Sequence, residues 1–323
     1  MDARVYQASA SAKVILCGEH AVVYGYPAIA VPVSDLRATA FFYPDEVNGL
    51  RVELPDVNEA WTWPPGAKGH PLALVIRETL AYLGGNGLKG RLVVRSDIPI
   101  GGGMGSSAAV ATAVVRVVAR ALGRSLSAKE TSSLVYRAEE VWHGTPSGID
   151  NTVIAYERPV WFVRGQPPEP FYPARAFTLV IADSGVSMPT REVVLDVRRR
   201  WEQDRARYEA LFQAIGDLVR QVRRALEAGE VEAVGPLLDE NQRLLAEMGV
   251  SSPLLEELVT AARAAGALGA KLAGAGRGGN VIALVREDDA PRVAEALRRA
   301  GAVRTFVTVV REQQATASRA GYP

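Results

Sequence analysis

One stretch of this sequence combines glycines and serines in a spacing suited to holding phosphate. It reads "SDIPIGGGMGSSAAV", from Ser96 to Val110. Ser is a favoured helix cap, and the Ala- and Val-rich residues that follow are compatible with a helix, so we expect one to begin at the serines. A glycine-rich turn before a helix presents unpaired N–H groups and the positive end of the helix dipole to an anion. The stretch therefore predicts a phosphate site.

Two familiar phosphate motifs do not describe the chain. A Walker A loop places Lys just before its Ser or Thr, whereas Gly105 precedes Ser106 here, so this loop supplies no catalytic lysine. The segment "GAGRGG", Gly274 to Gly279, does match the dinucleotide pattern of glycines. The "NVIALV" that follows reads as a strand, however, and that fold requires a helix at this point.

A second cluster, "EEVWHGTPSGIDN" from Glu139 to Asn151, carries carboxylates. Helical periodicity before it places Glu139 near the edge of an apolar face and Glu140 almost opposite, in solvent. Gly, Pro and Ser in the following turn predict that Asp150 lies on irregular backbone, where catalytic groups often occur. From the residues alone, Asp150 fits a turn residue as well as a base, and His143 fits a helix-end residue as well as a site residue.

Lys13 and the residues after it form the third candidate, "SAKVILCGEHAVVYGYPAIAV". Lys13 enters an apolar strand. A lysine there suits either an edge strand that must resist aggregation or a pocket that needs a positive charge. His20 follows Glu19 in the same motif, close in sequence to Lys13.

Composition limits the class of protein. The 323 residues suffice for two domains, and 37 basic against 36 acidic residues give no charge excess that favours nucleic acid or an anionic membrane. Cys17 is the only cysteine, which excludes an internal disulfide and suits a reducing cytosol. We find no signal peptide pattern, and Arg116 and Arg120 interrupt the longest apolar region. We expect a cytoplasmic protein with no membrane partner.

Strands and helices are expected around these motifs. Early strands are "KVILCG", "AIAVPV", "ATAFFYP", "LRVEL" and "GRLVVRSD", and later ones are "PVWFVR", "TLVIAD", "NVIALV" and "RTFVTVV". Helices are expected in "PLALVIRETLAYLGG", after the serines, from the capping box of Ser127 and Glu130, and from Thr190 to about Gly229, with two more beyond. The charge of the Thr190–Gly229 region is read as a solvated face. Four prolines between Gly165 and Phe177 indicate a domain boundary.

The three clusters, in this order, resemble the GHMP kinase superfamily over nearly the whole chain. Within it, "GEHAVVYG" followed by "PAIAV", together with "HGTPSGIDN", most resembles the mevalonate kinases. A galactokinase would carry an acidic sugar-reading motif where this chain has "AVVYG". The resemblance implies ATP-dependent phosphorylation of (R)-mevalonate at its 5-hydroxyl. Another kinase of the superfamily, for a sugar or phosphomevalonate, and a catalytically silent metabolite sensor are the alternatives.

The resemblance also implies the fold and the partners. The fold class is α+β with two domains: residues 1–170 form a ribosomal protein S5 domain 2-like α/β domain, and residues 171–323 form a ferredoxin-like domain. ATP would lie between them. The partners would be small molecules, mevalonate and ATP, without nucleic acid or membrane, and a homodimer is common in the family.

Family roles then map onto matching positions. Backbone N–H groups of one loop would wrap the ATP phosphates, and that loop comprises Pro99, Gly101, Gly102, Gly103, Met104, Gly105, Ser106, Ser107 and Ala108. A third motif, "KLAGAGRGG", would close over the phosphates through Gly274 and Gly276. Ser107 and Glu139 would hold Mg²⁺, whose preference for oxygen ligands agrees with those side chains.

The same mapping assigns the reacting groups. Asp150 would take the proton from the substrate hydroxyl, and Lys13 would lie beside it and favour its ionised form. The residues placed by the substrate are Glu19, His20, Ser147 and Thr190. The chain departs from the family's pattern at Tyr26, at Ala273 and at Arg277, where many relatives have Gly. Arg277 would either contact phosphate or face solvent.

Overall fold

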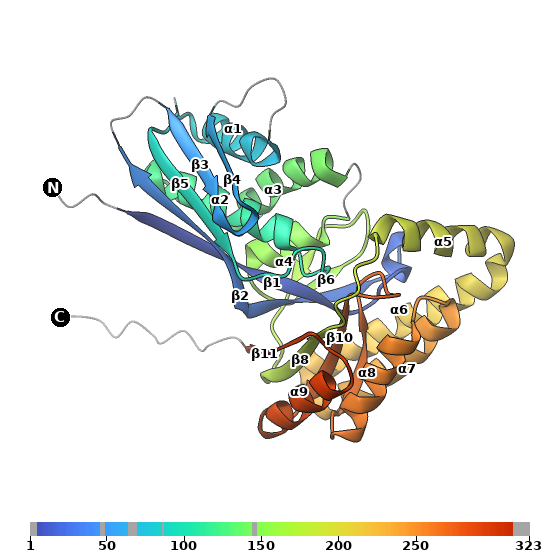
Figure 1. The fold of residues 1–323 in the computed structure, drawn as a ribbon. Coiled ribbons are helices and arrows are strands. Elements are labelled where there is room, and N and C mark those ends of the chain that lie inside the picture. Colours follow the sequence, from blue (N-terminus) through green and yellow to red (C-terminus); the bar gives the residue numbers. More distant parts are fainter. Residues whose placement is uncertain (1–4, 46–48, 64–69, 86, 144–146, 313–323) are drawn as a thin grey trace, which may run out of the picture.

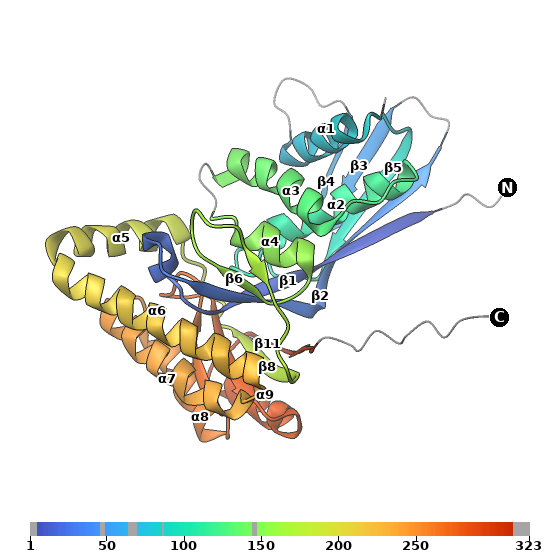
Figure 2. The same cartoon turned by 180° about the vertical axis from the view of Figure 1, so that it is seen from behind.

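The computed structural model describes residues 5–45, 49–63, 70–85, 87–143 and 147–312, with the backbone only for residues 141–143. Within these residues the chain forms two β-sheets, one of seven strands and one of four. Each sheet carries its own helices, and the two halves meet along β1, β2 and the ends of the second sheet (Figure 1; Figure 2). The candidate site residues named in the sequence analysis come from both halves.

The first sheet has the order β4-β3-β5-β2-β6-β7, with β1 paired to β2. Its strands are β1 (Tyr6–Cys17), β2 (Ala28–Pro44), β3 (Leu50–Leu54), β4 (Glu59–Trp63), β5 (Gly90–Ser96), β6 (Val160–Phe162) and β7 (Glu169–Pro170). Its helices are α1 (Pro71–Leu83), α2 (Ser106–Ala121), α3 (Ala128–His143) and α4 (Ile149–Tyr156). Helix α2 packs on β1 and β2 and contacts α1, α3 and α4, so it lies at the centre of this half.

Sequence patterns located most of these elements, with three differences. The expected strands "AIAVPV" and "ATAFFYP" are one strand, β2, because its two ends pair with different neighbours, β6 and β5. Trp61 and Trp63 lie in β4. Asp150 is in the first turn of helix α4, so the prediction of irregular backbone was wrong. An eight-residue helix gives too little periodicity to stand out from the glycines and proline before it.

The second sheet has the order β11-β8-β10-β9, all antiparallel. Its strands are β8 (Phe177–Asp183), β9 (Gly269–Ala273), β10 (Asn280–Val285) and β11 (Arg304–Val310). The helices are α5 (Thr190–Gln203), α6 (Arg205–Ala228), α7 (Val231–Met248), α8 (Pro253–Ala264) and α9 (Ala290–Arg299). Three helices rather than two follow α6, and β9 was not expected. The strand order is that of a ferredoxin-like sheet, which confirms the α+β fold class.

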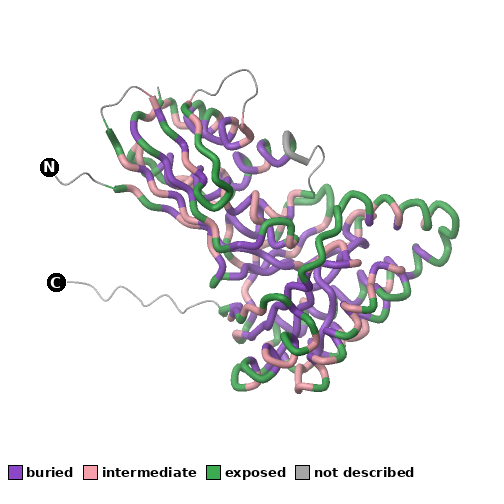
Figure 3. Tube along the Cα trace, in the orientation of Figure 1, coloured by how far each residue is buried: buried purple, intermediate pink, exposed green. Residues whose placement is uncertain are grey.

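The last strand of the first sheet ends at Pro170, and the second sheet begins at Phe177. Buried residues are continuous through both halves, whereas helix α5 is largely exposed (Figure 3). Within the described residues, no helix has both the length and the apolar character needed to cross a membrane.

Candidate active site

The phosphate-loop candidate joins β5 to α2, and its backbone is open to solvent at Gly101 and Gly103. The cap of α2 is Gly105, with φ +72°, so Ser106 and Ser107 are the first helical residues and neither is the expected cap. In the part of the chain that the structure describes, no side chain caps this helix start. Its first N–H groups therefore point into the loop, as an anion site requires.

Glycine at position 105 is required by space as well as by φ. A Cβ there would lie 2.8 Å from the Ile154 side chain and 3.1 Å from Cγ of Lys13. The Lys13 stem thus runs against the start of α2. The Lys13 backbone N–H donates to the Met104 carbonyl at 3.1 Å, which ties the loop to β1.

Lys13 and Asp150 form an ion pair, with Nζ 2.9 Å from Oδ1. Lys13 is 5% exposed, which rules out the reading of an exposed edge-strand lysine. The β1–β2 ladder shifts register on both sides of Lys13, between Ser11 and Ala12 and between Ile15 and Cys17. Such irregularities re-aim side chains, here toward the loop and α4. The structure therefore brings the predicted base and its cation together beside the phosphate loop.

Helix α4, which carries Asp150, is held by buried polar contacts. The Asn151 amide donates to the Ser132 carbonyl at 3.1 Å and to its hydroxyl at 2.8 Å. The Thr152 hydroxyl donates to the Gly148 carbonyl at 2.7 Å. At its other end, Arg116 of α2 donates to the Ala155 carbonyl at 2.8 Å. Asp150 is consequently positioned from both ends of a short helix, with its carboxylate partly open to solvent.

The predicted metal pair sits on two helices that pack together. Ser107 lies in the first turn of α2 and is half-buried, and Glu139 lies on α3 and is buried, while Glu140 is exposed as the helical face predicted. Among the described residues, no three His, Cys, Asp or Glu side chains gather into a metal site. A cation held here would depend on few protein ligands.

Glu19 has a partner that the sequence did not reveal. Its carboxylate accepts from Nζ of Lys271 on β9, a residue of the other half of the molecule, and both side chains are at most 1% exposed. Lys271 also donates to the Leu272 carbonyl. A lysine in the otherwise apolar "GAKLAGA" was the available signal, but its partner lies 252 residues away. Glu19 is engaged in joining the two halves.

His20 is also turned toward the second half. Its Nε2 is 2.8 Å from the Ala275 carbonyl, and because that oxygen only accepts, Nε2 carries the proton. Burial lowers the pKa of His20 to about 4, and the nearby Arg277 and Lys271 charges act in the same direction. His20 is therefore neutral at physiological pH. Its backbone φ is +60°. It links the Glu19–His20 motif to the third glycine loop.

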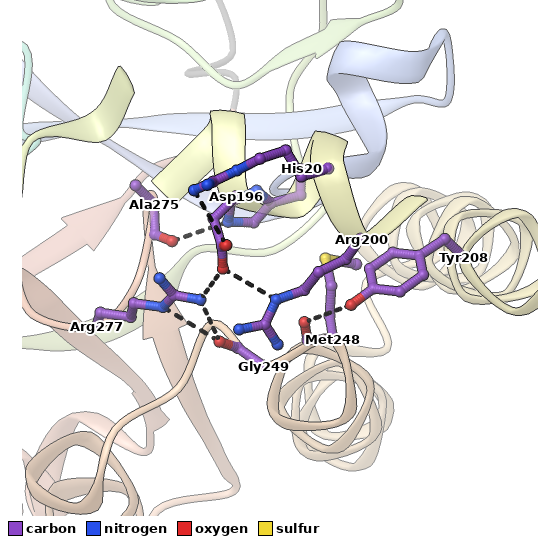
Figure 4. Close-up of polar contacts among 9 residues, drawn as sticks. His20, Asp196, Arg200, Tyr208, Met248, Gly249, Ala275 and Arg277 are labelled. Carbon is purple, nitrogen blue, oxygen red and sulfur yellow. Dashed lines mark hydrogen bonds and ion pairs between the residues drawn. The ribbon is translucent and has the colours of Figure 1, made fainter. Parts of the chain in front are cut away.

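The third glycine loop joins β9 to β10 and is pressed against the end of α7. A Cβ on Gly276 would lie 2.1 Å from the Val250 carbonyl oxygen. The Arg277 guanidinium has partners within the protein: it donates to Asp196 of α5 and to the Gly249 carbonyl (Figure 4). Asn280, just after this loop, donates to the Gly102 carbonyl of the phosphate loop. Asn280 was not singled out in the sequence.

The remaining predicted substrate residues lie on exposed backbone. Ser147 precedes α4, with its hydroxyl accepting from the Ile149 N–H at 3.3 Å. Thr190 is the first residue of α5 and is exposed. Of the motif Glu139–Asn151, residues 144–146 and the His143 side chain lie outside the described residues.

Comparison with known proteins identifies the family. The family description "GHMP kinases N terminal domain" matches residues 71–158, and "GHMP kinases C terminal" matches residues 222–303. A mevalonate kinase of Pyrococcus furiosus is 35% identical over 325 aligned residues, covering 94% of this chain and 96% of the relative. The chain belongs to the GHMP kinase family. Membership makes it a phosphotransferase with ATP as co-substrate.

Other relatives of this GHMP kinase agree. A mevalonate kinase of Aeropyrum pernix is 34% identical and covers 91% of this chain and 93% of the relative. Among solved structures, L. major mevalonate kinase in complex with R-mevalonate superposes with a TM-score of 0.83 at 27% identity, covering 96% of this chain and 97% of the other. A galactokinase of Lactococcus lactis, 18% identical with a TM-score of 0.75 and covering 96% of this chain and 94% of the other, supports the fold alone.

Proposed function

We propose that this GHMP kinase transfers the γ-phosphoryl group of ATP to the 5-hydroxyl of (R)-mevalonate, giving 5-phosphomevalonate and ADP. The observation that carries the proposal is the Lys13–Asp150 pair, whose lysine stem runs against the glycine that opens α2. A carboxylate and a cation beside an anion-binding helix start are what phosphoryl transfer to an alcohol needs. The mevalonate kinase relatives and the structure with R-mevalonate support this choice of acceptor.

In this proposal Asp150 accepts the proton as the hydroxyl attacks. The Lys13 Nζ lies 2.9 Å from the Asp150 Oδ1, so its charge would stabilise the negative charge that develops on the attacking oxygen. The hydroxyl proton moves to Asp150, the oxygen forms its bond to the γ-phosphorus, and the bond to the β-phosphate oxygen breaks. A positioned base typically contributes about 10²- to 10⁴-fold to such a step.

The phosphates of ATP would lie over the loop from Pro99 to Ala108, on N–H groups that α2 leaves uncapped. The donor set fits Mg²⁺, because a hydroxyl from Ser107 and a carboxylate from Glu139 are oxygen ligands on two packed helices. Bound there with the ATP phosphates, the ion would neutralise phosphate charge. Gly274 and Gly276 of the third loop would cover the phosphates from the other half.

The surroundings favour an acceptor without a phosphate group. Lys271 and Arg277, the two cations of the third motif, are already paired with Glu19 and Asp196. A phosphate group on the acceptor would have to compete for those ion pairs. Glu19 and His20 would then shape the substrate end by holding the two halves together, with Ser147 and Thr190 as the exposed residues that contact mevalonate. This is the reason to rank mevalonate above phosphomevalonate.

The test is ADP release by the purified protein with Mg²⁺ and ATP against mevalonate, phosphomevalonate, galactose, N-acetylhexosamines and homoserine. We expect turnover on mevalonate, a 5-phosphate product by NMR, and loss of turnover in Asp150→Asn with ATP binding retained. Turnover on another acceptor alone would overturn the acceptor and keep the kinase. No turnover on any acceptor, with ATP still bound, would favour the silent sensor.

The same proposal includes a domain boundary between residues 170 and 171, a cytoplasmic enzyme, and a homodimer. Light scattering tests the dimer through its mass. Limited proteolysis tests the boundary, since the first cleavage should fall between Pro170 and Phe177.

A further inference from the structure

Helix α5 is attached to the rest of the molecule by unusually little apolar contact. It has 14 residues, of which Val193 and Val197 are buried and Trp201 is partly buried, in contact with Tyr24. It stands out as mostly exposed beside the packed helices α6 and α7 (Figure 3). Thr190, the proposed contact to mevalonate, is its first residue. The position of Thr190 therefore depends on whatever else holds α5.

A polar cluster provides that attachment. Asp196 of α5 receives the Arg277 guanidinium from the third glycine loop, and Arg277 also donates to the Gly249 carbonyl at 3.2 Å (Figure 4). Arg277 thus bridges α5 and the C-terminal end of α7, where a positive charge is favoured by the helix dipole. The Arg277 contact holds the pKa of the Asp196 carboxyl below its usual value.

The third loop itself has anchors that do not involve the Arg277 side chain. The Arg277 backbone N–H donates to the Val250 carbonyl at 2.7 Å, and the Gly279 N–H donates to Val186 at 2.8 Å. The Ala275 carbonyl accepts from His20. Removing the Arg277 side chain would therefore loosen α5, which keeps only its apolar contacts, and leave the loop in place.

Arg277 occupies backbone that disfavours it. Its φ is +58°, a left-handed conformation that glycine adopts without strain. A residue with a long side chain at such a position indicates that its contacts offset the strain. Asp196 and Gly249 are the contacts that the structure supplies.

We propose that Arg277 is a positioning residue that fastens α5 to the third glycine loop, so that the substrate-binding Thr190 is placed relative to the loop that covers the phosphates. This rests on the proposed function for the roles of Thr190 and the loop. We call the Arg277–Asp196 ion pair the latch. Losing it should weaken binding of the acceptor more than binding of ATP, because the loop keeps its own anchors.

The test uses two variants. Arg277→Gly removes the side chain and the backbone strain at position 277, and Asp196→Asn removes the negative charge that pairs with Arg277. Arg199→Gln is the matched control, because Arg199 lies 3.4 Å from the same carboxylate of Asp196 but is an exposed residue of α5 itself. For both latch variants we expect KM for mevalonate to rise about tenfold, as the loss of one charge-assisted pair would allow. KM for ATP should stay within about twofold, and the double variant should be no worse than either single one.

Hydrogen exchange gives a readout that does not need turnover. Amides of α5 should exchange faster in Arg277→Gly and Asp196→Asn than in the wild type, while Arg199→Gln stays close to the wild type. Arg277→Lys, which keeps the charge, should restore part of the acceptor affinity.

Two results would overturn the latch: unchanged exchange in α5 in both variants, or an equal rise of KM in Arg199→Gln. Rising KM values for both substrates alike would reduce Arg277 to a general structural role, which also overturns it. Failure of the wild type to phosphorylate mevalonate would refute the proposed function, and the exchange experiment would still decide whether the latch exists.

Discussion

The two halves of the molecule are built by different means. We call the half that contains α2 the first side and the half that contains α5 the second side. Ten of the 16 residues of α2 are buried, and this helix sets both the phosphate loop and, through α4, Asp150. Only two of the 14 residues of α5 are buried, and the Arg277–Asp196 ion pair adds to the attachment of α5. Apolar packing is insensitive to pH and salt compared with ion pairs. The side that performs the proposed chemistry is fixed by core packing, and the side that covers the substrate depends on a few polar contacts.

This contrast is useful because covering elements must open and close, and elements with few buried apolar contacts open at low cost. The Lys271–Glu19 pair is the exception on the second side, since it is fully buried. It holds β9 to the Glu19–His20 motif, so we regard it as the fixed point between the two halves.

The largest expected effect comes from breaking that fixed point. Lys271→Met leaves the Glu19 carboxylate buried without its cation, which should lower the free energy of unfolding by about 3–5 kcal/mol. Urea denaturation measures the loss. The double variant Lys271→Met with Glu19→Leu should recover much of it, because no buried charge remains unpaired. A single variant as stable as the wild type to within about 1 kcal/mol would show that the pair is not a fixed point.

His20 should make the contact between the halves sensitive to acid. Its pKa is about 4 in the folded protein, below the ordinary 6.5, so the unfolded chain binds a proton first as pH falls. The resulting stability is complete above pH 6.5 and is lost between pH 6.5 and about 4, by up to about 3 kcal/mol.

The measurement is urea denaturation of the wild type and of His20→Asn at several values of pH in that window. Asn keeps a polar side chain without a titrating ring at position 20, where φ is +60° and ψ is −51°. The variant should be less stable at neutral pH but should lack this part of the acid-induced loss. Parallel curves for the two proteins would contradict the assignment.

The packing of the first side can be disturbed by a steric substitution rather than by a change of charge. Gly105→Ala places a methyl group against Ile154 and Lys13, and a displacement of reacting groups by about 1 Å can lower the rate about 10²-fold. Gly103→Ala is the control, because Gly103 has a similar φ of +71° with no heavy atom within 4 Å of an added Cβ. Both variants carry the backbone strain, so the difference in kcat for ADP release isolates the contact with Lys13. Equal kcat values would show that the contact does not position Lys13.

The smallest expected effect concerns Cys17, at the end of β1. Burial, with a lesser contribution from the Glu19 charge, raises the pKa of the Cys17 thiol, and the side chain is fully buried. Because the thiolate is the reactive form, Cys17 should not react with a disulfide reagent at pH 8 in the native protein and should react in urea. Fast reaction in the native state would mean that the first side opens as readily as α5.

Sequence patterns predicted much of the first side. The helix after the two serines, the capping box and the strands around them follow from local periodicity and capping, which depend on residues close in sequence. The contrast between Glu139 and Glu140 followed from the same periodicity, and burial agrees with it. Short elements were less predictable: α4 and β9 have eight and five residues, too few for a clear pattern.

By itself, the sequence determined the family, the identity of the motifs and the order in which they occur. Only the tertiary structure decided how their side chains are used. Lys13 reaches Asp150 across 137 positions of the printed sequence, Glu19 is occupied by Lys271, and Arg277 binds Asp196. The physical reason is that a charge takes the nearest opposite charge in a desolvated setting, and which one is nearest depends on how the two sheets meet.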